Sequence, residues 1–527
     1  MEQASADNHS VIRLAELVAS LSFATDLGRG LPMEHSIRRA RLALRLADRT
    51  GADEHDRIAT YYTGLLDGVY CHADANEQAM WFGDDIRMKA DTYDADIESL
   101  KGLLVMLRQL GAGQSGLARA RRMAAFPLRG WKEVNGWLDT HSALQAQFAT
   151  RIGLPPSVSE ALRKSYERWD GKGVPDGIGG EDIPLAARIV CLADVVEVHN
   201  HRGGVEAARA VARARSGGEF DPQLAGTLCD HAADLLEGLD EETSWGDVIA
   251  AEPGLDRTVR GEELDVALEA MGDLVDMKSP HMAGHSRGVA SLAAEAARIS
   301  GMSAAEQELL RRAGFIHDLG RLGVSNAIWD KPGPLTATDR ERVRLHPYLT
   351  DRMAAGITAL KPVRALAARH HERLDGSGYP AGLSGVELSR SDRILAAADA
   401  YHAMTEPRPY RSELPPATAA AELRAEVRAG RLDDDTVNAV LAAAGHRAPA
   451  RRERPGGLTA REVEVLSLLA RGYSNKAIAK RLFITAKTVS SHVQHIYTKI
   501  DVSSRARATH FAIQHGLVGS YEASAET

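Results

Sequence analysis

Residues 317–321 read His-Asp-Leu-Gly-Arg and stand in the middle of a stretch, residues 279–411, in which imidazole and carboxylate side chains recur. The stretch holds five separated elements, which in order are Ser279-Pro280-His281-Met282-Ala283-Gly284-His285, His317-Asp318, His346, His370-His371 and Asp399. Neutral imidazole and carboxylate are ligands that suit Mn, Fe, Zn and Ni. Because six His and two Asp are more than one ion needs, the pattern predicts a site for more than one divalent metal.

Two further motifs complete the stretch, the loop Asp375-Gly376-Ser377-Gly378-Tyr379-Pro380 and the segment Arg408-Pro409-Tyr410-Arg411. With them, the order of all the elements resembles the HD-GYP family of metal-dependent phosphohydrolases over residues 262–448. The resemblance implies a domain that holds two divalent ions, Fe or Mn, and hydrolyses a phosphodiester. It also implies a cyclic dinucleotide as the substrate, with cyclic di-GMP as the favoured candidate.

The resemblance also assigns a set of ligands to each ion. Asp318 stands at the position of the family's bridging carboxylate, and the remaining ligands divide into His285, His317 and Asp399 for the first ion and His346, His370 and His371 for the second. Arg321 stands where the family usually carries a lysine that touches the substrate phosphate. Arginine keeps the positive charge of that lysine, but its planar guanidinium differs in shape from an ammonium group. Asp318 and Arg321 are therefore the catalytic candidates, and the rate of turnover is left open.

Several residues near these ligands have two interpretations. His281 lies four residues before His285, on the same side of a helix, so it is either a candidate ligand for a third metal or part of a polar helix face. Gly378 and Tyr379 are expected to shape the substrate pocket, although glycines here also fit an ordinary tight turn. Arg408 and Arg411 either meet the second phosphate of the substrate or form surface salt bridges.

The region before this stretch repeats it in a worn form. The correspondences are 167–175 with 372–380, His141 with His346 and Asp194 with Asp399 at an offset of about 205 residues, and His35 with His285 at an offset of about 250. Such self-similarity indicates a tandem repeat. The difference between the two offsets predicts a longer middle in the first copy, within residues 70–135.

The first copy has lost most of the predicted metal ligands. Asp67-Gly68 stands in place of His317-Asp318, and Ser165-Tyr166 stands in place of His370-His371. Without a bridging carboxylate and a pair of imidazoles, residues 31–245 are expected to carry out no metal chemistry. The copy would then be kept for packing, dimerisation or ligand sensing, and its remaining polar residues are expected to be satisfied core groups.

The composition is that of a multidomain helical protein. The chain has 527 residues, of which 44% are hydrophobic and only 5% aromatic, so aliphatic packing must fill the cores of two to four domains. Its cysteines, Cys71, Cys191 and Cys229, show no metal-binding spacing and fit a reducing cytoplasm. Residues 1–10 do not resemble a signal peptide, and no apolar run approaches the roughly 20 residues of a membrane helix. We expect a cytoplasmic protein without a membrane partner.

The C-terminal end is basic, unlike the rest of the chain. Residues 451–518 contain 12 Lys and Arg against 4 Asp and Glu, whereas the whole chain has a formal net charge of −8. Thr459-Ala460-Arg461-Glu462 is a capping box that begins the first of four short predicted helices. Short helices joined by turns, with a basic third helix from residue 486 to about 500, are typical of helix-turn-helix DNA binding.

Residues 458–518 resemble the LuxR-type DNA-binding module throughout their length. The resemblance places the third helix in the major groove, and it implies a homodimer because paired half-sites mirror a two-fold protein. Val489 is an ambiguous member of the set of candidate contacts, since its spacing also fits the core. A solvated basic helix with no role in DNA binding is the alternative. The candidate contacts to bases or phosphates are Asn475, Lys476, Lys487, Thr488, Val489, Ser491, His492 and Lys499.

The sequence therefore predicts an all-α chain with two tandem HD-type helical domains and a small four-helix helix-turn-helix domain. Two functions fit it. Either the chain is a transcriptional regulator that hydrolyses a cyclic dinucleotide, or its phosphohydrolase pocket is weak or inactive and senses a nucleotide to control DNA binding. The expected boundaries are 1–30 for a leader helix, 31–245 for the degenerate copy, 262–448 for the phosphohydrolase domain, 449–457 for a linker and 458–519 for the DNA-binding domain.

Overall fold

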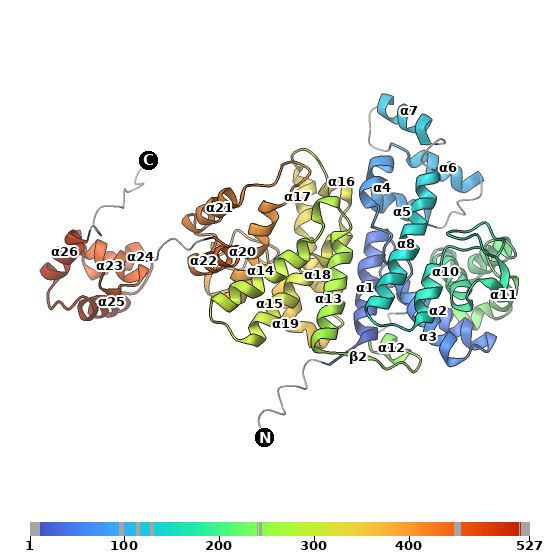
Figure 1. Cartoon of the computed structure of the whole chain (residues 1–527), viewed down its shortest axis with the longest axis horizontal. Coiled ribbons are helices and arrows are strands. Elements are labelled where there is room, and N and C mark those ends of the chain that lie inside the picture. Colours follow the sequence, from blue (N-terminus) through green and yellow to red (C-terminus); the bar gives the residue numbers. More distant parts are fainter. Residues whose placement is uncertain are drawn as a thin grey trace, which may run out of the picture. The chain divides into compact units, whose positions relative to one another are not determined.

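The regular secondary structure of the computed structural model is almost entirely helical (Figure 1). The structure describes residues 11–93, 100–111, 116–126, 131–239, 241, 245–446, 455–515 and 517. The one sheet among these residues pairs β1 (Ile12–Arg13) with β2 (Thr258–Val259) in antiparallel register. The all-α fold class is therefore confirmed. The chain divides into two compact units, residues 1–446 and residues 447–527, so both helical copies lie in the same unit.

The first copy extends from α1 to α12. Its additional middle length, relative to the second copy, lies in the helices α4 to α7. A single-turn helix, η3 (Gly180–Asp182), precedes α10. The helices are α1 (Leu14–Arg29), α2 (His35–Thr50), α3 (Glu54–Leu66), α4 (Ala75–Phe82), α5 (Asp85–Thr92), α6 (Leu100–Gln109), α7 (Gly116–Ala125), α8 (Trp131–Arg151), α9 (Pro156–Arg163), α10 (Leu185–Arg215), α11 (Pro222–Leu236) and α12 (Trp245–Ala250).

The second copy extends from α13 to α22 and includes several single-turn helices at its connections. Its elements are α13 (Gly261–Asp276), η4 (Pro280–Met282), α14 (His285–Ile299), α15 (Ala304–Ile316), η5 (Leu319–Gly323), α16 (Asn326–Trp329), α17 (Ala337–Arg344), α18 (His346–Met353), η6 (Thr358–Leu360), α19 (Lys361–Ala367), η7 (Gly385–Glu387), α20 (Arg390–Thr405), α21 (Pro416–Arg428) and α22 (Asp434–Ala443).

Helix α1 ties the two copies together. Its residues Leu14, Leu17 and Leu21 are at most 3% exposed, as expected of a helix that is apolar on more than one face. It packs on α2 and α3 of the first copy and on η5 and α18 of the second. The hydroxyl of Ser20 donates a hydrogen bond of 2.6 Å to the carbonyl oxygen of Met353. One hydrophobic cluster consequently runs through both copies.

The two copies begin with the same local structure. Asp26, in the last turn of α1, accepts hydrogen bonds from the backbone N–H and the hydroxyl of Ser36 in α2. Asp276, at the end of α13, accepts the same two bonds from Ser286 in α14. Each pair fixes the angle between one helix and the next, so the first residue of α2 and the first residue of α14 occupy equivalent places.

A buried carboxylate of the first copy is anchored in the second. The Oδ1 atom of Asp85, at the start of α5, accepts hydrogen bonds from the hydroxyl of Ser325 at 2.7 Å and from the backbone N–H of Asn326 at 2.8 Å. Its Oδ2 atom lies 3.5 Å from Nζ of Lys278. Ser325 comes two residues after η5, so α5 is bonded directly to the segment that follows the His-Asp motif.

The C-terminal unit is a small helical domain with its own core. Thr459 and Glu462 form the predicted capping box, and Ser474 and Thr485 cap the next two helices. Such caps satisfy backbone N–H groups that have no partner within the helix. No helix among the described residues of the chain is long and apolar enough to cross a lipid bilayer. The elements are η8 (Pro455–Gly457), α23 (Ala460–Ala470), α24 (Asn475–Leu482), α25 (Ala486–Lys499) and α26 (Arg505–Gln514).

Replacing Leu21 by alanine is expected to lower the free energy of unfolding of the first unit by about 2–5 kcal/mol, because the substitution leaves a cavity in the helix that both copies share. Chemical denaturation of the full chain, followed by circular dichroism, measures this change. Leu117→Ala is the matched control, since Leu117 is 84% exposed and its loss should change stability by less than about 0.5 kcal/mol. Proteolysis that opens only the first copy of Leu21→Ala would contradict a shared core.

Candidate metal centre and nucleic-acid interface

The imidazole and carboxylate side chains of the second copy gather where several helix ends meet. Gly320 makes this convergence possible. A Cβ atom at this position would lie 1.9 Å from the carbonyl oxygen of His346, so glycine allows η5 to approach α18 closely. The ligand positions are the first residues of α14 and α18 (His285 and His346), the residues that follow α15 (His317 and Asp318), the turn after α19 (His370 and His371) and the middle of α20 (Asp399).

Asp318 lies between two groups of imidazoles. Its Oδ1 atom is 3.3 Å from Nε2 of His346 and 3.8 Å from Nε2 of His370. Its Oδ2 atom is 3.7 Å from Nε2 of His317 and 3.9 Å from Nε2 of His285. The two oxygens of one carboxylate therefore face two different sets of nitrogen ligands, which is the arrangement that a bridging ligand requires.

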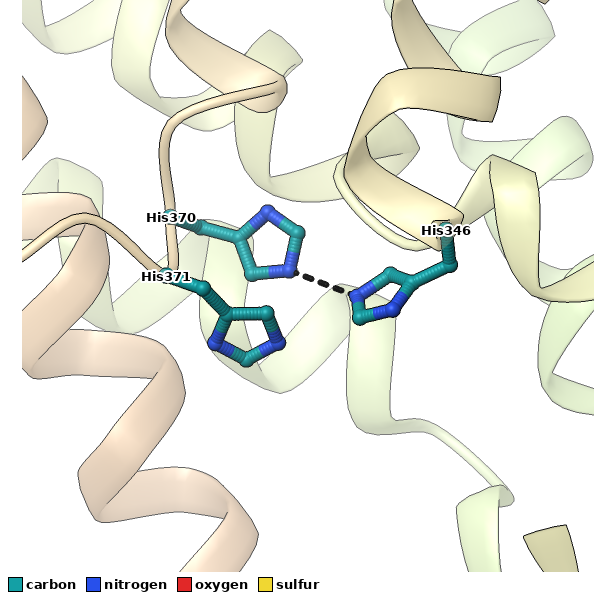
Figure 2. Close-up of side chains that lie close together, drawn as sticks. All are labelled: His346, His370 and His371. Atoms are coloured by element: carbon teal, nitrogen blue, oxygen red, sulfur yellow. Dashed lines mark hydrogen bonds between the residues drawn. The ribbon is translucent and has the colours of Figure 1, made fainter. Parts of the chain in front are cut away.

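Asp399 and His371 complete the two groups. Oδ1 of Asp399 lies 3.4 Å from Nε2 of His285 and 3.8 Å from Nε2 of His317, while its Oδ2 lies 3.8 Å from Nδ1 of His371. The ring of His371 lies beside that of His370, with centroids 4.1 Å apart, and both point toward His346 (Figure 2). The structure thus brings together all seven ligand candidates of the two predicted metal ions.

The hydrogen bonds of the rings show that the centre fits cations. His317, His346 and His370 each donate Nδ1–H to a backbone carbonyl, at 2.8, 2.6 and 2.7 Å, which leaves a lone pair on each Nε2. The Nε2 atoms of His346 and His370 are only 3.1 Å apart (Figure 2). Among the described residues, the buried Nε2 of His317 has no hydrogen-bond partner. Lone pairs that face each other in this way repel unless a cation accepts them, so the donor set fits divalent metals.

Burial and charge leave Asp318, His346 and His370 in the forms that bind metal. Burial disfavours the ionised form of Asp318, but Arg321 and the surrounding histidines outweigh burial and lower its pKa below the usual range. Burial lowers the pKa of His346 to about 4 and that of His370 to about 3. Both rings are therefore neutral near pH 7. Metal ions bind ionised carboxylates and neutral imidazoles.

Two residues that the sequence analysis did not single out support His285. Oε2 of Glu406 lies 2.8 Å from Nδ1 of His285, and Oε1 of Glu406 lies 3.2 Å from Nδ1 of His402. Burial lowers the pKa of His285, but Asp399 and Glu406 outweigh burial and raise it to about 9. A signal was present, since His402 and Glu406 follow Asp399 by three and seven residues and so lie on the same helix face.

Arg321 and the loop residues border the centre. Nη1 of Arg321 lies 3.5 Å from Oδ2 of Asp318, and its guanidinium stacks on the ring of Trp329 at 3.7 Å. The ring of Tyr379 has its centroid 4.7 Å from that of His371. Gly378 must be glycine for a structural reason, because a Cβ there would lie 2.5 Å from the backbone nitrogen of the residue at 373.

Arg408, Arg411 and His281 do not point at the seven ligands. Arg408 donates hydrogen bonds to the carbonyl oxygen of His281 at 3.0 Å and to Glu406 at 2.8 Å. Arg411 donates to the backbone carbonyl oxygens of Met404 at 3.0 Å and Ala403 at 2.6 Å, at the end of α20. These contacts are neither a phosphate contact nor a surface salt bridge, the two roles that the sequence left open for Arg411. The side chain of His281 belongs to none of the groups of potential metal ligands among the described residues.

Known proteins share this organisation. The 3'3'-cGAMP-specific phosphodiesterase 3 of Vibrio cholerae serotype O1 is 32% identical over 408 residues, which span 76% of this chain and 88% of that protein. The chain belongs to the HD-GYP family. The HD domain profile matches residues 137–224 and 269–436, one segment in each copy, and the profile described as bacterial regulatory proteins, luxR family, matches residues 457–512. The HD-GYP and LuxR-type resemblances of the sequence are therefore confirmed.

Two further relatives show how far the likeness extends. A solved structure of a cyclic GMP-AMP-specific phosphodiesterase of V. cholerae, V-cGAP3, is 28% identical, covers 83% of this chain and 99% of its own, and has a TM-score of 0.56. The cyclic di-GMP phosphodiesterase response regulator RpfG of Xanthomonas campestris pv. campestris is 35% identical over 144 residues, which span 27% of this chain and 38% of that protein. The likeness to RpfG is thus much shorter than the likeness to the first relative.

In the first HD-GYP copy the positive charge of an arginine balances the carboxylates of Asp67 and Asp194. The fully buried Arg39 donates to Oδ1 of Asp194 at 2.5 Å and lies 3.5 Å from Oδ2 of Asp67. Oδ1 of Asp194 also lies 3.1 Å from Nε2 of His35, and its Oδ2 accepts from the hydroxyl of Tyr93 at 2.5 Å. Every group of potential metal ligands found among the described residues belongs to the second copy.

The LuxR-type domain presents most of the candidate DNA contacts to solvent. Lys476, Lys487, Thr488 and Ser491 are exposed, and Asn475 and His492 are half-buried. Val489 is 0% exposed and packs in the domain core, which corrects its prediction as a base contact, since a side chain enclosed by its own domain cannot reach a base. Nζ of Lys499 forms a 2.7 Å ion pair with Glu462, so part of its charge is already neutralised.

His346→Ala is expected to reduce the metal content of the HD-GYP centre, because it removes one nitrogen that faces Oδ1 of Asp318. Asp318→Asn is expected to reduce it further, since this carboxylate faces both groups of imidazoles. The measurement is the metal content of protein purified with Mn²⁺ or Fe²⁺, determined by mass spectrometry of the metals. His281→Ala is the matched control and should keep the wild-type metal content. An Asp318→Asn protein with unchanged metal content would contradict the ligand assignment.

Proposed function

We propose that this chain is a DNA-binding regulator whose second copy hydrolyses a 3',3'-cyclic dinucleotide with two divalent metal ions, Fe or Mn. The observation that carries the proposal is the position of Asp318, whose two oxygens face separate groups of imidazoles. Paired ions of this kind supply a hydroxide near neutral pH and neutralise the oxygens of a phosphodiester. In this proposal His285, His317, Asp318 and Asp399 hold one ion, and Asp318, His346, His370 and His371 hold the other.

Backbone carbonyls and one carboxylate orient the ligands. The carbonyls that accept Nδ1–H from three of the rings fix those rings with Nε2 toward the centre. Glu406 does the same for His285, and Arg408 and His402 in turn hold Glu406. Partners of this kind fix the orientation of a metal-binding imidazole and raise its basicity. Glu406 and His402 are therefore positioning residues in this proposal.

Arg321 is the candidate phosphate-binding residue. Its stacking on Trp329 holds the guanidinium plane beside Asp318. A guanidinium fixed in this way can donate two parallel hydrogen bonds to the oxygens of a phosphate. Tyr379 lies next to His371, with the guanidinium of Arg344 5.0 Å from its ring centroid. The substrate is expected to bind between these residues.

The proposed substrate class rests on the relatives and on the completeness of the centre. The relative that aligns over 408 residues is named for 3'3'-cGAMP, and relatives that align over shorter segments are named for 3'3'-cGAMP or for cyclic di-GMP. Both molecules are 3',3'-cyclic dinucleotides. Because no residue of the second copy is tied to one base by these observations, the proposal is limited to that class.

The purified full chain, supplied with Mn²⁺ or Fe²⁺, is expected to linearise cyclic di-GMP, 3'3'-cGAMP or both, as followed by liquid chromatography. Asp318→Asn should lower turnover by at least about 100-fold, the scale typical of losing one group that stabilises transition-state charge. Asp351→Asn is the matched control, because Asp351 pairs with Arg364 on the surface away from the centre, and it should keep wild-type turnover.

Failure of the full metal-loaded chain to cleave either dinucleotide would contradict the enzymatic proposal. If the same protein still changed its affinity for DNA on adding a dinucleotide, the alternative function, a nucleotide sensor without turnover, would be supported. Chains that lack residues 447–527 should cleave as fast as the full chain but should not bind DNA.

The DNA-binding half of the proposal predicts a defined salt dependence. Lys476→Ala should weaken binding to all DNA sequences alike and lower the slope of log affinity against log salt by about one unit, because one phosphate contact is lost. Fluorescence anisotropy at several salt concentrations measures the slope. Lys361→Ala, in the first unit, is the matched control and should leave the slope unchanged. An unchanged slope for Lys476→Ala would remove this residue from the proposed interface.

A further inference from the structure

The first copy contains a cavity where the second copy has its metal centre. The cavity has a volume of about 330 Å³. Five of the residues that line it stand, at the offsets found in the sequence, where the second copy carries a predicted metal ligand. The loss of the imidazoles has therefore left a partly open space in the fold at this place. The lining residues at those positions are Asp67, His141, Ser165, Tyr166 and Asp194.

The residues that line this cavity are of two chemical kinds. Some are apolar or aromatic, with Phe82, Met88 and Trp137 among them, and these belong to a separate hydrophobic cluster of the first copy. Others are charged, and they include the cations Arg29 and Lys89 as well as the carboxylates Asp67, Glu167 and Asp194. A molecule that fills the space would consequently bury an apolar or aromatic body against the first kind and place a negative group against the two cations.

Several buried polar atoms on the cavity wall lack a partner. Among the described residues, Nζ of Lys89, Oε1 of Gln78, Oδ1 of Asp67 and Oε2 of Glu167 make no hydrogen bond. Lys89 is 9% exposed, and the nearest carboxylate oxygen, Oδ2 of Asp85, lies 3.6 Å away. Arg29 stacks on Tyr93 at 4.5 Å and makes only a 3.5 Å contact to the carbonyl oxygen of Asp67. Buried polar groups are normally satisfied. Nζ of Lys89 requires an acceptor, whereas the oxygens of Gln78, Asp67 and Glu167 require N–H or O–H donors, so these atoms point to a ligand that carries an anionic group together with donors on its ring system.

We propose that this cavity binds a small aromatic anion, one ring system with a single phosphate or carboxylate, and that its occupancy is passed to the metal centre. The volume lies at the lower end of the roughly 300–1,000 Å³ that small-molecule sites occupy. It therefore suits one nucleotide or one aromatic acid rather than a cyclic dinucleotide. The anion contacts Lys89 and Arg29, and the ring system packs against Trp137 and Phe82.

The route to the metal centre is short. Lys89 and Met88 lie on α5, and the first residue of that helix is Asp85, which binds Ser325 and Asn326 of the second copy. Ser325 follows η5, and η5 begins immediately after Asp318. An anion that draws Lys89 away from Asp85 changes the charge balance at this contact. This part of the inference rests on the proposed hydrolysis, whereas the binding of the anion does not.

Cys71 offers a local measurement of binding. It lines the cavity. Burial raises the pKa of its thiol, but Arg29 and His141 outweigh burial and bring the pKa to about 7. A large fraction is then thiolate, the reactive form, at pH 7.5. Cys229 lies outside the cavity and serves as an internal reference, so alkylation of each cysteine by iodoacetamide, measured by mass spectrometry on the full chain, separates occupancy of this site from binding at the metal centre.

GMP, AMP and indole-3-carboxylate are the probes, and guanosine is the uncharged control. We expect at least one of the anions to slow alkylation of Cys71 by about tenfold or more in a saturable manner, with guanosine much weaker and Cys229 unaffected. The comparison of GMP with indole-3-carboxylate distinguishes a phosphate from a carboxylate source. Protection by none of the probes would overturn the proposal and leave a cavity that holds water only.

Two variants test the assigned contacts. Lys89→Gln keeps most of the side chain but removes the charge, and it should weaken protection by the anion about tenfold without changing the effect of guanosine. Lys164→Gln, which alters a lysine paired with Asp176 outside the cavity, is the matched control. Equal protection in Lys89→Gln and the wild type would overturn the assignment of the anion to Lys89.

Ser325→Ala tests the passage to the metal centre. It removes the hydroxyl that donates to Asp85, and it should preserve the protection of Cys71 while reducing the effect of the anion on turnover. A chain in which the anion protects Cys71 but leaves turnover unchanged in the wild type would refute the regulatory half alone. If the chain has no turnover at all, the protection experiment still decides whether the site exists.

Discussion

The structure of the second copy depends on one carboxylate that must remain charged while almost fully buried. Asp318 is 4% exposed, and removing such a group from water is costly unless positive charge compensates it. The chain meets this constraint by bringing five imidazoles and Arg321 around it, on segments that are distant in sequence. The helix ends that carry them converge because Gly320 lets η5 lie against α18. The arrangement of the candidate metal ligands is therefore also a packing arrangement.

In the first copy, side chains alone compensate the charge of the equivalent carboxylate, Asp194. Asp194 is half-buried, and its charge is balanced by Arg39 and by hydrogen bonds from His35 and Tyr93. Burial disfavours its ionised form, yet these neighbours lower its pKa well below the usual range. A covalently attached guanidinium thus stabilises the fold where the other copy offers a place for exchangeable ions. The two copies show two ways of compensating a carboxylate at one position of one fold.

The sequence predicted the fold class, the two copies and the seven metal-ligand candidates because motif order and offset survive even where ligands do not. It did not predict the hydrogen bond between Glu406 and His285, since the role of that carboxylate depends on which ring nitrogen of the histidine faces it. It also did not predict the contacts of Arg411, whose backbone partners at the end of α20 exist only once the helix has formed. Val489 was ambiguous for a similar reason, because helical spacing alone does not say how wide the buried face of a short helix is. The cavity of the first copy was not predicted, because the sequence shows which ligands were replaced but not whether the surrounding helices close the space that remains.

The continuous core that passes through α1 has an evolutionary consequence. Substitutions on the outer, apolar framework of the first copy would disturb the second copy as well, so selection for the second would preserve that framework even if the first had no task. Some interior polar positions experience less restraint, and those equivalent to His317, Asp318, His370 and His371 differ between the two copies. Gly173 and Gly378 fit this account: at each, a Cβ would lie within 2.6 Å of several backbone atoms, and both glycines have been kept while the neighbouring histidines of one copy have gone. A duplicated domain fused in this way is free to acquire a new ligand without risking its shape.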